Sequence, residues 1–234
     1  MSGQRVAVAG GDTIAAAVEA AGGVPVAPDD AASAAIVVAA GEGALVDVAR
    51  RGVDAPVLPV DAGAGTRSVP AEAVTAAVEG ALAGDCRTEP LSPVRTGTDG
   101  VALFDVALLA AEPARISEFS IRYRGDRLTR FRADGVVAST PAGSVGYNRA
   151  ADGPLVAPGT GVVAVVPIAP FRTDDARWVL PPEEVTLAVE RDETPIEVLL
   201  DGRLERTAST ADPISLEPAE GIEVLLVPES RSFF

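Results

Sequence analysis

The pattern of apolar residues changes near residue 85, and this change limits the fold more than any other feature of the 234-residue chain. Before it, short apolar runs typical of strands alternate with alanine-rich stretches typical of helices. We expect strands at 5–9, 24–27, 35–39 and 57–60, and helices at 12–21, 44–51 and 70–83. Alternation with short loops predicts parallel strands covered by helices.

Beyond this point the chain contains strand-like runs almost exclusively. Residues 84–100 are rich in Pro, Gly, Thr and Asp, which is typical of a linker. After them we expect strands at 101–109, 116–123, 128–133, 161–166, 185–189, 196–200 and 222–227. The sequence therefore predicts two domains, an α/β domain over residues 1–95 and a mainly-β domain over residues 96–234.

The charged residues exclude several kinds of chemistry. The chain has 34 acidic residues against 19 basic ones, a net charge of -15, and every base is arginine because the sequence contains no lysine and no histidine. A Walker lysine, a Ser-His-Asp triad and a zinc–histidine site are therefore excluded. The single cysteine, Cys86, allows no intramolecular disulfide. So negative a chain repels nucleic acid and anionic membranes, and we expect neither as a partner.

The location follows from what the sequence lacks. No stretch approaches the 18 or so apolar residues of a membrane span. The first dozen residues lack the basic segment and long apolar run of a signal peptide. We therefore expect a cytoplasmic protein, and the acidic, lysine-free composition resembles that of halophilic proteins.

One stretch, residues 134–148, has the composition of a nucleotide-binding turn. A strand runs into Thr140-Pro141, and small residues continue to Tyr147. Gly143 permits close backbone approach, which lets main-chain N–H groups and hydroxyls reach phosphate and ribose oxygens. Tyr147 adds a flat face and a hydroxyl. An ordinary glycine-bearing loop would have the same composition.

The same stretch resembles the NAD kinase family. That family's signature Asp-Gly…Thr-Pro-Thr-Gly-Ser-Thr-Ala-Tyr…Gly-Gly-Pro is matched in order and spacing by Asp134, Gly135, Thr140, Pro141, Gly143, Ser144, Tyr147, Gly153 and Pro154. Pro167–Pro170, Arg177–Pro182 and Asp201-Gly202 resemble its later segments, and the likeness covers about residues 35–228.

The resemblance implies a fold, a reaction and ligands. The implied fold is a Rossmann-like α/β N-terminal domain with a parallel sheet, plus a mainly-β C-terminal domain. The implied reaction moves the γ-phosphoryl group of ATP to the adenosine 2′-hydroxyl of NAD, with Mg²⁺ or another divalent metal and no direct protein ligand to it. It also implies a homodimer or homotetramer. The residues implied to bind nucleotide are Asp134, Thr140, Pro141, Gly143, Ser144, Tyr147 and Asp201.

The sequence departs from the family at two motifs. The catalytic Gly-Gly-Asp-Gly-Thr falls on residues 40–44, where Gly41 and Gly43 still permit an anion-facing turn and Glu42 replaces the aspartate. Glu42 keeps a carboxylate, one methylene longer, that can accept the 2′-hydroxyl proton or orient the metal. The family's Asn-Glu pair falls on Phe104 and Asp105, which keeps an acid but loses the amide.

Phosphate neutralisation must come from arginine, metal and backbone amides. Arg122, Arg124, Arg127, Arg130 and Arg132 cluster around one turn, as either a phosphate clamp or a solvated face paired with acids. Arg132, Arg149 and Arg177 are our candidates for phosphate contacts. Two alternatives remain: a nucleotide-binding paralogue that has lost catalysis and acts as a sensor or partner subunit, and a kinase with another acceptor.

Overall fold

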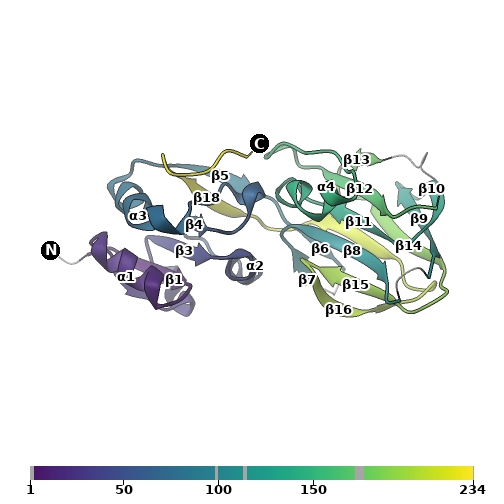
Figure 1. Ribbon diagram of the computed structural model, residues 1–234, viewed down its shortest axis with the longest axis horizontal. Coiled ribbons are helices and arrows are strands. Elements are labelled where there is room, and N and C mark those ends of the chain that lie inside the picture. Colours follow the sequence, from purple (N-terminus) through teal and green to yellow (C-terminus); the bar gives the residue numbers. More distant parts are fainter. Residues whose placement is uncertain (1–2, 98–99, 113–114, 172–176, 234) are drawn as a thin grey trace. The chain divides into compact units, whose positions relative to one another are not determined.

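The computed structural model describes residues 3–97, 100–112, 115–171 and 177–233, which form two compact units. The first unit contains Met1–Leu91 and Glu220–Phe234, and the second contains Ser92–Ala219. Residues 220–234, assigned to the C-terminal domain from the sequence, thus belong to the first unit. The reason is strand pairing, since a late strand lies between two early ones (Figure 1).

The first unit is an α/β layer built on one six-stranded sheet. Its strand order is β2-β1-β3-β4-β18-β5, parallel throughout except for the last pair. The strands are β1 (Arg5–Ala9), β2 (Val24–Val26), β3 (Ile36–Ala40), β4 (Val57–Val60), β5 (Arg87–Leu91) and β18 (Ile222–Leu226). The helices are α1 (Asp12–Ala20), α2 (Glu42–Arg51) and α3 (Val74–Ala83), with short 3₁₀ turns η1 (Pro28–Ser33), η2 (Ala64–Thr66) and η3 (Ala71–Ala73).

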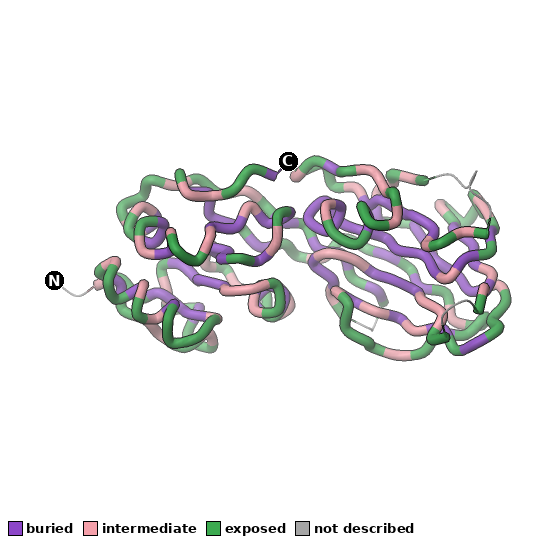
Figure 2. The backbone as a smooth tube through the Cα atoms, in the orientation of Figure 1, coloured by how far each residue is buried: buried purple, intermediate pink, exposed green. Residues whose placement is uncertain are grey.

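Apolar alternation places the core of the first unit against the sheet. Val6 and Val8 of β1 and Ile36 and Val38 of β3 belong to one buried cluster, together with side chains from α1 and α3. β3 and β4 are buried along nearly their whole length, as expected of parallel strands covered on both faces (Figure 2). The sheet therefore presents the loops that follow β3 and β4 at its carboxyl edge.

The second unit consists of two antiparallel sheets that share a core. One sheet has the order β10-β9-β14-β17-β6-β7 and the other β13-β12-β11-β8-β15-β16. Phe119, Ile121 and Leu187 from the first sheet and Leu108 and Val136 from the second lie in one buried cluster. The strands are β6 (Val94–Thr96), β7 (Gly100–Ala102), β8 (Asp105–Ala110), β9 (Ser117–Tyr123), β10 (Asp126–Ala133), β11 (Gly135–Ser139), β12 (Val163–Ile168), β13 (Trp178–Leu180), β14 (Val185–Arg191), β15 (Ile196–Leu200), β16 (Arg203–Ala208) and β17 (Ile214–Pro218).

Two short helical turns follow β11 in the second unit, η4 (Ala142–Val145) and α4 (Tyr147–Ala150). They carry Gly143, Ser144 and Tyr147 of the signature expected to bind nucleotide. None of the helices in the described part of the chain is long and apolar enough to cross a membrane.

The boundary between the two units falls within the linker expected at 84–100, between Leu91 and Ser92, but the stretch is not free of strands. β5 and β6 lie within it, pairing with β18 and β17. Their turn-rich composition hides them, because distant strands supply the hydrogen-bonding partners and local propensity is overridden. The single strand expected at 101–109 is also interrupted, since β7 ends at Ala102 and β8 begins at Asp105.

Candidate functional site

The signature turn, residues 140–147 of the second unit, is tied to the break between β7 and β8. The Thr140 backbone N–H donates to the Phe104 carbonyl at 2.9 Å, and the Thr140 hydroxyl donates to the Leu103 carbonyl at 2.7 Å. The Gly143 N–H donates in turn to the Thr140 hydroxyl at 3.3 Å. Thr140 is almost completely buried, so it holds the turn rather than presenting its hydroxyl to a ligand.

Gly143 is required by close approach of two backbone segments. A Cβ atom built at this position would lie 2.0 Å from the Phe104 carbonyl oxygen and 2.6 Å from its carbon. Both atoms are backbone, so neither can move aside as a flexible side chain would. The match to the family at this glycine therefore has a structural cause.

The carboxylate of Asp201 organises the same break from the other side. It accepts hydrogen bonds from the backbone N–H groups of Leu103 at 3.1 Å, Phe104 at 2.7 Å and Asp105 at 3.3 Å. The Asp201 N–H donates back to the Asp105 carbonyl at 3.0 Å. Sequence analysis placed Asp201 against the nucleotide and missed this main-chain role. The structure thus brings Phe104, Asp105, Thr140, Gly143 and Asp201 into one cluster.

Ser144 and Asn148 close the loop that follows the turn. The Ser144 hydroxyl donates to the Pro141 carbonyl at 2.7 Å and accepts from the Val156 N–H at 3.0 Å. The Asn148 amide donates to the carbonyls of Ser144 and Pro154, at 3.2 and 2.8 Å. Both side chains are fully buried. Sequence analysis missed Asn148, and a buried amide within a glycine- and proline-rich loop gives no pattern that would reveal it.

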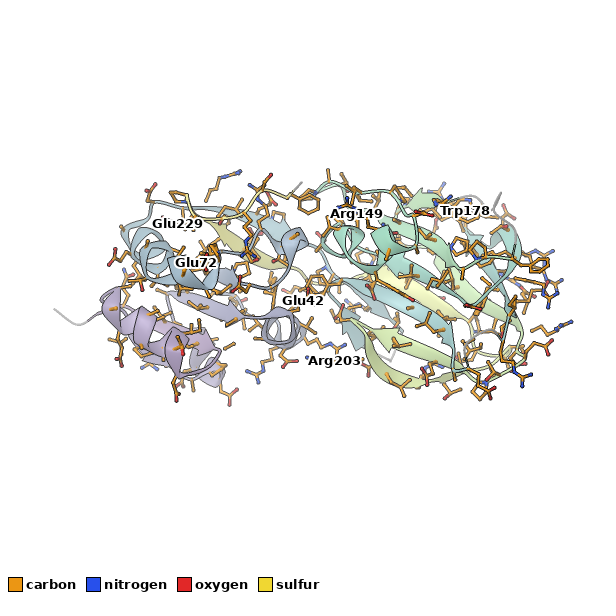
Figure 3. The ribbon with its side chains drawn as sticks, viewed as in Figure 1. Glu42, Glu72, Arg149, Trp178, Arg203 and Glu229 are labelled. Carbon is orange, nitrogen blue, oxygen red and sulfur yellow. The ribbon has the colours of Figure 1, made fainter. Side chains whose placement is uncertain are left out.

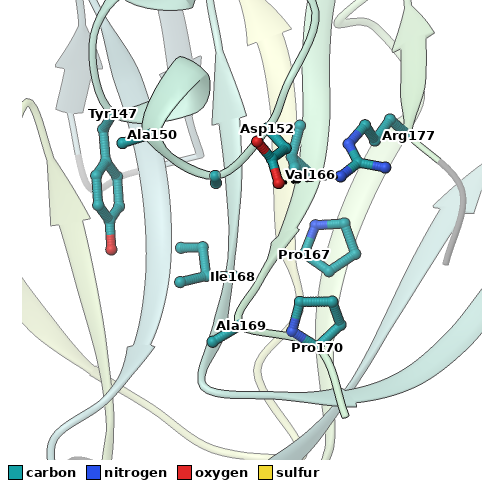
Figure 4. A pocket seen from close by; sticks show the side chains of 10 residues that line it. Tyr147, Ala150, Asp152, Val166, Pro167, Ile168, Ala169, Pro170 and Arg177 are labelled. Atoms are coloured by element: carbon teal, nitrogen blue, oxygen red, sulfur yellow. Dashed lines mark ion pairs between the residues drawn. The ribbon is translucent and has the colours of Figure 1, made fainter. Parts of the chain in front are cut away.

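A cavity of about 450 Å³ lies beside α4 in the second unit. We call it the Tyr147 cavity; Figure 4 shows residues lining it, among them Tyr147, Asp152, Ile168, Ala169, Pro170 and Arg177. The Tyr147 side chain is partly exposed. Partial burial raises the pKa of the Tyr147 phenol, and the negative charges of Asp105 and Asp134 raise it further. A flat ring close to carboxylates therefore forms one wall.

Asp134 and Asp105 lie at opposite ends of β11. The Asp134 N–H donates to the carbonyl of Ile168, which lines the cavity, at 3.0 Å. Asp105 is the register partner of Ser139 at the other end, where the signature turn begins. Both acids are half-buried. Asp134 precedes β11 and Asp105 pairs across from its last residue, so a carboxylate lies near each end of the strand that leads into the turn.

The arginines divide into two groups. Arg122, Arg124 and Arg130 form ion pairs with Glu190, Glu184 and Glu118, which is the solvated, acid-paired arrangement rather than a phosphate clamp. Of the three candidate phosphate contacts, Arg177 lines the Tyr147 cavity. Arg132 stacks on the Phe171 ring, with 5.9 Å between guanidinium carbon and ring centroid, and Arg149 is exposed on α4 (Figure 3).

Gly41, Glu42 and Gly43 lie at the start of α2 in the first unit. The helix begins at Glu42 rather than at residue 44, with Gly41 as its N-cap at φ 87°, a conformation that favours glycine. The Gly41 N–H donates to the Val60 carbonyl at 2.8 Å, which joins this turn to the end of β4. Glu42 is exposed in the first helical turn (Figure 3), where a helix favours negative charge.

A second loop of the first unit approaches Glu42. A Cβ atom built on Gly63, in the loop after β4, would lie 2.7 Å from a carboxylate oxygen of Glu42. The Thr66 hydroxyl fixes that loop by donating to the Gly63 carbonyl at 2.9 Å. Glu42 thus lies where the loops after two neighbouring parallel strands meet, a usual position for a ligand site in such sheets. The small residues of 61–66 are the signal that could have revealed the second loop.

The described residues contain no group of three or more His, Cys, Asp or Glu side chains arranged to hold a metal ion. Mg²⁺ commonly uses one or two carboxylates, water and substrate phosphates rather than a cage of protein ligands. A Mg²⁺ ion carried on substrate phosphates would not need such a group of protein ligands.

Comparisons with known proteins agree on one relationship. The family model for the ATP-NAD kinase C-terminal domain matches residues 104–225. The NAD kinase of Geobacter metallireducens is 30% identical over 211 residues, covering 85% of this chain and 75% of the relative. The NAD kinase of Methanosarcina barkeri is 35% identical over 115 residues, covering 48% of this chain. The match spans only 40–42% of the length of three Methanosarcina relatives.

Two solved structures share the fold. Yeast NADH kinase in complex with NADH has a TM-score of 0.77 at 18% identity, covering 98% of this chain and 85% of that one. An NAD kinase from Archaeoglobus fulgidus in complex with ATP has a TM-score of 0.74 at 20% identity, covering 96% of this chain and 93% of that one. The predicted fold class, an α/β N-terminal part and a mainly-β C-terminal part, is confirmed.

Proposed function

Because this chain belongs to the NAD kinase family, we propose that it transfers the γ-phosphoryl group of ATP to the 2′-hydroxyl of the adenosine ribose of NAD. One observation chiefly supports this proposal. The residues that match the family in the second unit hold the main chain of the signature turn and of the Phe104–Asp105 break through hydrogen bonds. These contacts set the shape of the turn that would face the dinucleotide.

The second unit would bind the dinucleotide. Asp105 is placed by Asp201 at the start of β8, and its carboxylate would hold ribose hydroxyls. The signature turn would face the pyrophosphate with backbone N–H groups, as small residues permit. Tyr147 would present its ring to the ligand. Thr140 and Ser144 are buried, so they would act through the shape of the turn.

Glu42 would accept the proton. In the transfer, a bond forms between the ribose 2′-oxygen and the γ-phosphorus, and the bond from that phosphorus to the oxygen bridging it to ADP breaks. The proton of the 2′-hydroxyl passes to the Glu42 carboxylate, and ADP leaves with the electron pair. When bound, Mg²⁺ supplies neutralisation of phosphate charge. Positioning and neutralisation provide most of the catalysis in such transfers.

The direct test measures NADP formation from NAD, ATP and Mg²⁺ at low and high salt, after the fold of the protein has been verified. We expect NADP to appear. A second protein carries Glu42→Asp and Phe104→Asn, which restore the side chains of the family motifs at two positions. It is measured in the same assay. If both proteins are folded and neither forms NADP, the proposed reaction is wrong.

A second candidate function is favoured by Phe104. Its N–H donates to the Asp201 carboxylate and its carbonyl accepts from the Thr140 hydroxyl. Its phenyl ring, however, stands where the family motif has a hydrogen-bonding amide. A nucleotide-binding paralogue without catalysis would show calorimetric binding of NAD or NADP with no turnover. Absence of any nucleotide binding would remove both candidates.

A further inference from the structure

Asp152 carries a side chain at a backbone position suited to glycine. Its φ is 58°, in the left-handed region where L-residues are uncommon and Asp and Asn are the better tolerated. It stands where the family signature has the first glycine of Gly-Gly-Pro. An unfavourable backbone conformation that carries a side chain at a ligand cavity is a reason to look for a function of that side chain.

The Asp152 carboxylate lines the Tyr147 cavity opposite an arginine. One of its oxygens lies 3.8 Å from the Arg177 guanidinium, and both residues line the cavity (Figure 4). The Asp152 side chain is 90% exposed, so solvent and a bound ligand can both reach it. Arg177 is the cation among the described lining residues, and Asp152 balances its charge.

We propose that Asp152 is a specificity-determining residue that disfavours additional negative charge in the Tyr147 cavity, so that the site binds the dinucleotide substrate in preference to its 2′-phosphorylated product. This inference rests on the proposed function, because that reaction supplies a substrate and product that differ by one phosphate group. A phosphomonoester adds about 1.5 to 2 negative charges at neutral pH.

The Asp152–Arg177 pair sets the charge that a ligand meets at this side of the cavity. With Asp152 present, the Asp152–Arg177 pair has no net charge, and Asp105 and Asp134 add negative charge beside Tyr147, so the product gains nothing from Arg177. Without it, Arg177 attracts whichever ligand is more negative. At separations of several ångströms in a solvent-exposed site, one unit of charge changes the affinity for the product by about threefold to tenfold. Salt screens the effect, because the Debye length falls to about 3 Å at 1 M.

The experiment is a double-mutant cycle on the full chain. Calorimetry gives the Kd of NAD and of NADP for the wild type, Asp152→Asn, Arg177→Gln and the double variant, at low and high salt. Asn keeps the shape and the left-handed backbone. Asp126→Asn removes an exposed acid at the β9–β10 turn and controls for total charge.

We expect Asp152→Asn to lower the Kd of NADP by about threefold to tenfold more than the Kd of NAD. Arg177→Gln should have the opposite effect, the double variant should return to the wild-type ratio, and high salt should reduce all differences. The inference is overturned if Asp152→Asn shifts both affinities equally, if Asp126→Asn has the same effect, or if no protein binds either dinucleotide. Binding with the expected ratios but without turnover would overturn the proposed reaction alone, and turnover with unchanged ratios would overturn the inference alone.

Discussion

The two units use their signature residues in opposite ways. In the second unit Thr140, Ser144 and Asp201 bind backbone groups and are wholly or partly buried. In the first unit Glu42 is exposed, and its carboxylate lies beside Gly63. The signature residues of the second unit thus lie where the main chain depends on them, and Glu42, where the resemblance implies an aspartate, lies on a surface.

This difference teaches what a family match means at each position. A residue that holds backbone geometry can be changed only by disturbing the fold, so its identity reports on structure. A residue on the surface of a functional loop can be changed with little effect on the fold, so its identity reports on chemistry. Substitutions of the signature residues in the second unit should therefore change mainly the stability. Substitution of Glu42 in the first unit should change mainly the reaction rate.

The largest expected effect is that of Gly143→Ala. The new methyl group would meet the Phe104 carbonyl, so we expect the second unit to lose at least about 3 kcal/mol of stability, the upper range for overpacking. Gly11→Ala is the control, because its backbone is extended, with φ −81° and ψ 178°, and no atom lies within 4 Å of the added Cβ. Urea unfolding followed by Trp178 fluorescence measures both variants. Equal stability of the two would contradict the close approach.

Glu42→Gln tests the first unit by rate. We expect NADP formation to fall about 100-fold or more, the usual contribution of a positioned general base, and the unfolding midpoint to remain unchanged. Glu72→Gln removes another exposed acid of the same unit (Figure 3) and should leave the rate unchanged. A loss of stability in Glu42→Gln would show that this residue is structural after all.

Asp201→Ala removes the acceptor of three backbone N–H groups. We expect a loss of about 2 kcal/mol, the scale for hydrogen bonds to a charged group, and amide chemical shift changes at residues 103–105. Asp192→Ala, which removes an exposed acid in the loop after β14, serves as control. If both variants unfold at the same denaturant concentration, Asp201 does not support the break between β7 and β8.

The smallest effect concerns the acid-paired face of the second unit. The Ser120 hydroxyl, which donates to Glu190 at 2.7 Å, lowers the pKa of that carboxyl, and Arg122 lowers it further. A lowered pKa in the folded state stabilises the protein above the ordinary pKa of the group, and this stabilisation is lost as the pH falls through the lowered value.

Ser120→Ala should therefore cost about 1 kcal/mol at neutral pH, and the difference from the wild type should vanish in acid. Unfolding measured between neutral pH and pH 3 checks this. Ser215→Ala, whose hydroxyl pairs with the uncharged Thr186, should give a difference independent of pH. A pH-independent effect of Ser120→Ala would exclude the carboxylate interaction.

The sequence predicted most elements because their patterns are local. β1, β4 and β15 begin and end at the predicted residues, since each is a short apolar run between turn residues. β5 and β16 were missed, because RTEPL and RLERTA are largely polar and become strands only by pairing with β18 and β15. Their partners are visible only in three dimensions.

The candidate site was predicted in part for the same reason. The signature turn follows from a contiguous motif. The Asp201 contacts with Leu103–Asp105 span almost a hundred residues, and the approach of Gly63 to Glu42 depends on the order of β3 and β4. The cytoplasmic location, the homo-oligomer and the halophilic character stay predictions.

The position of β18 has a consequence for synthesis. Because Ile222–Leu226 lies between β4 and β5, the first sheet lacks an inner strand until the residues of the second unit have been synthesised. The second unit is continuous along the chain, so the ribosome releases all of it earlier. Although domains usually mature in the order of their synthesis, here the first unit begins before the second and is completed after it, and the growing polypeptide carries an open sheet edge until then.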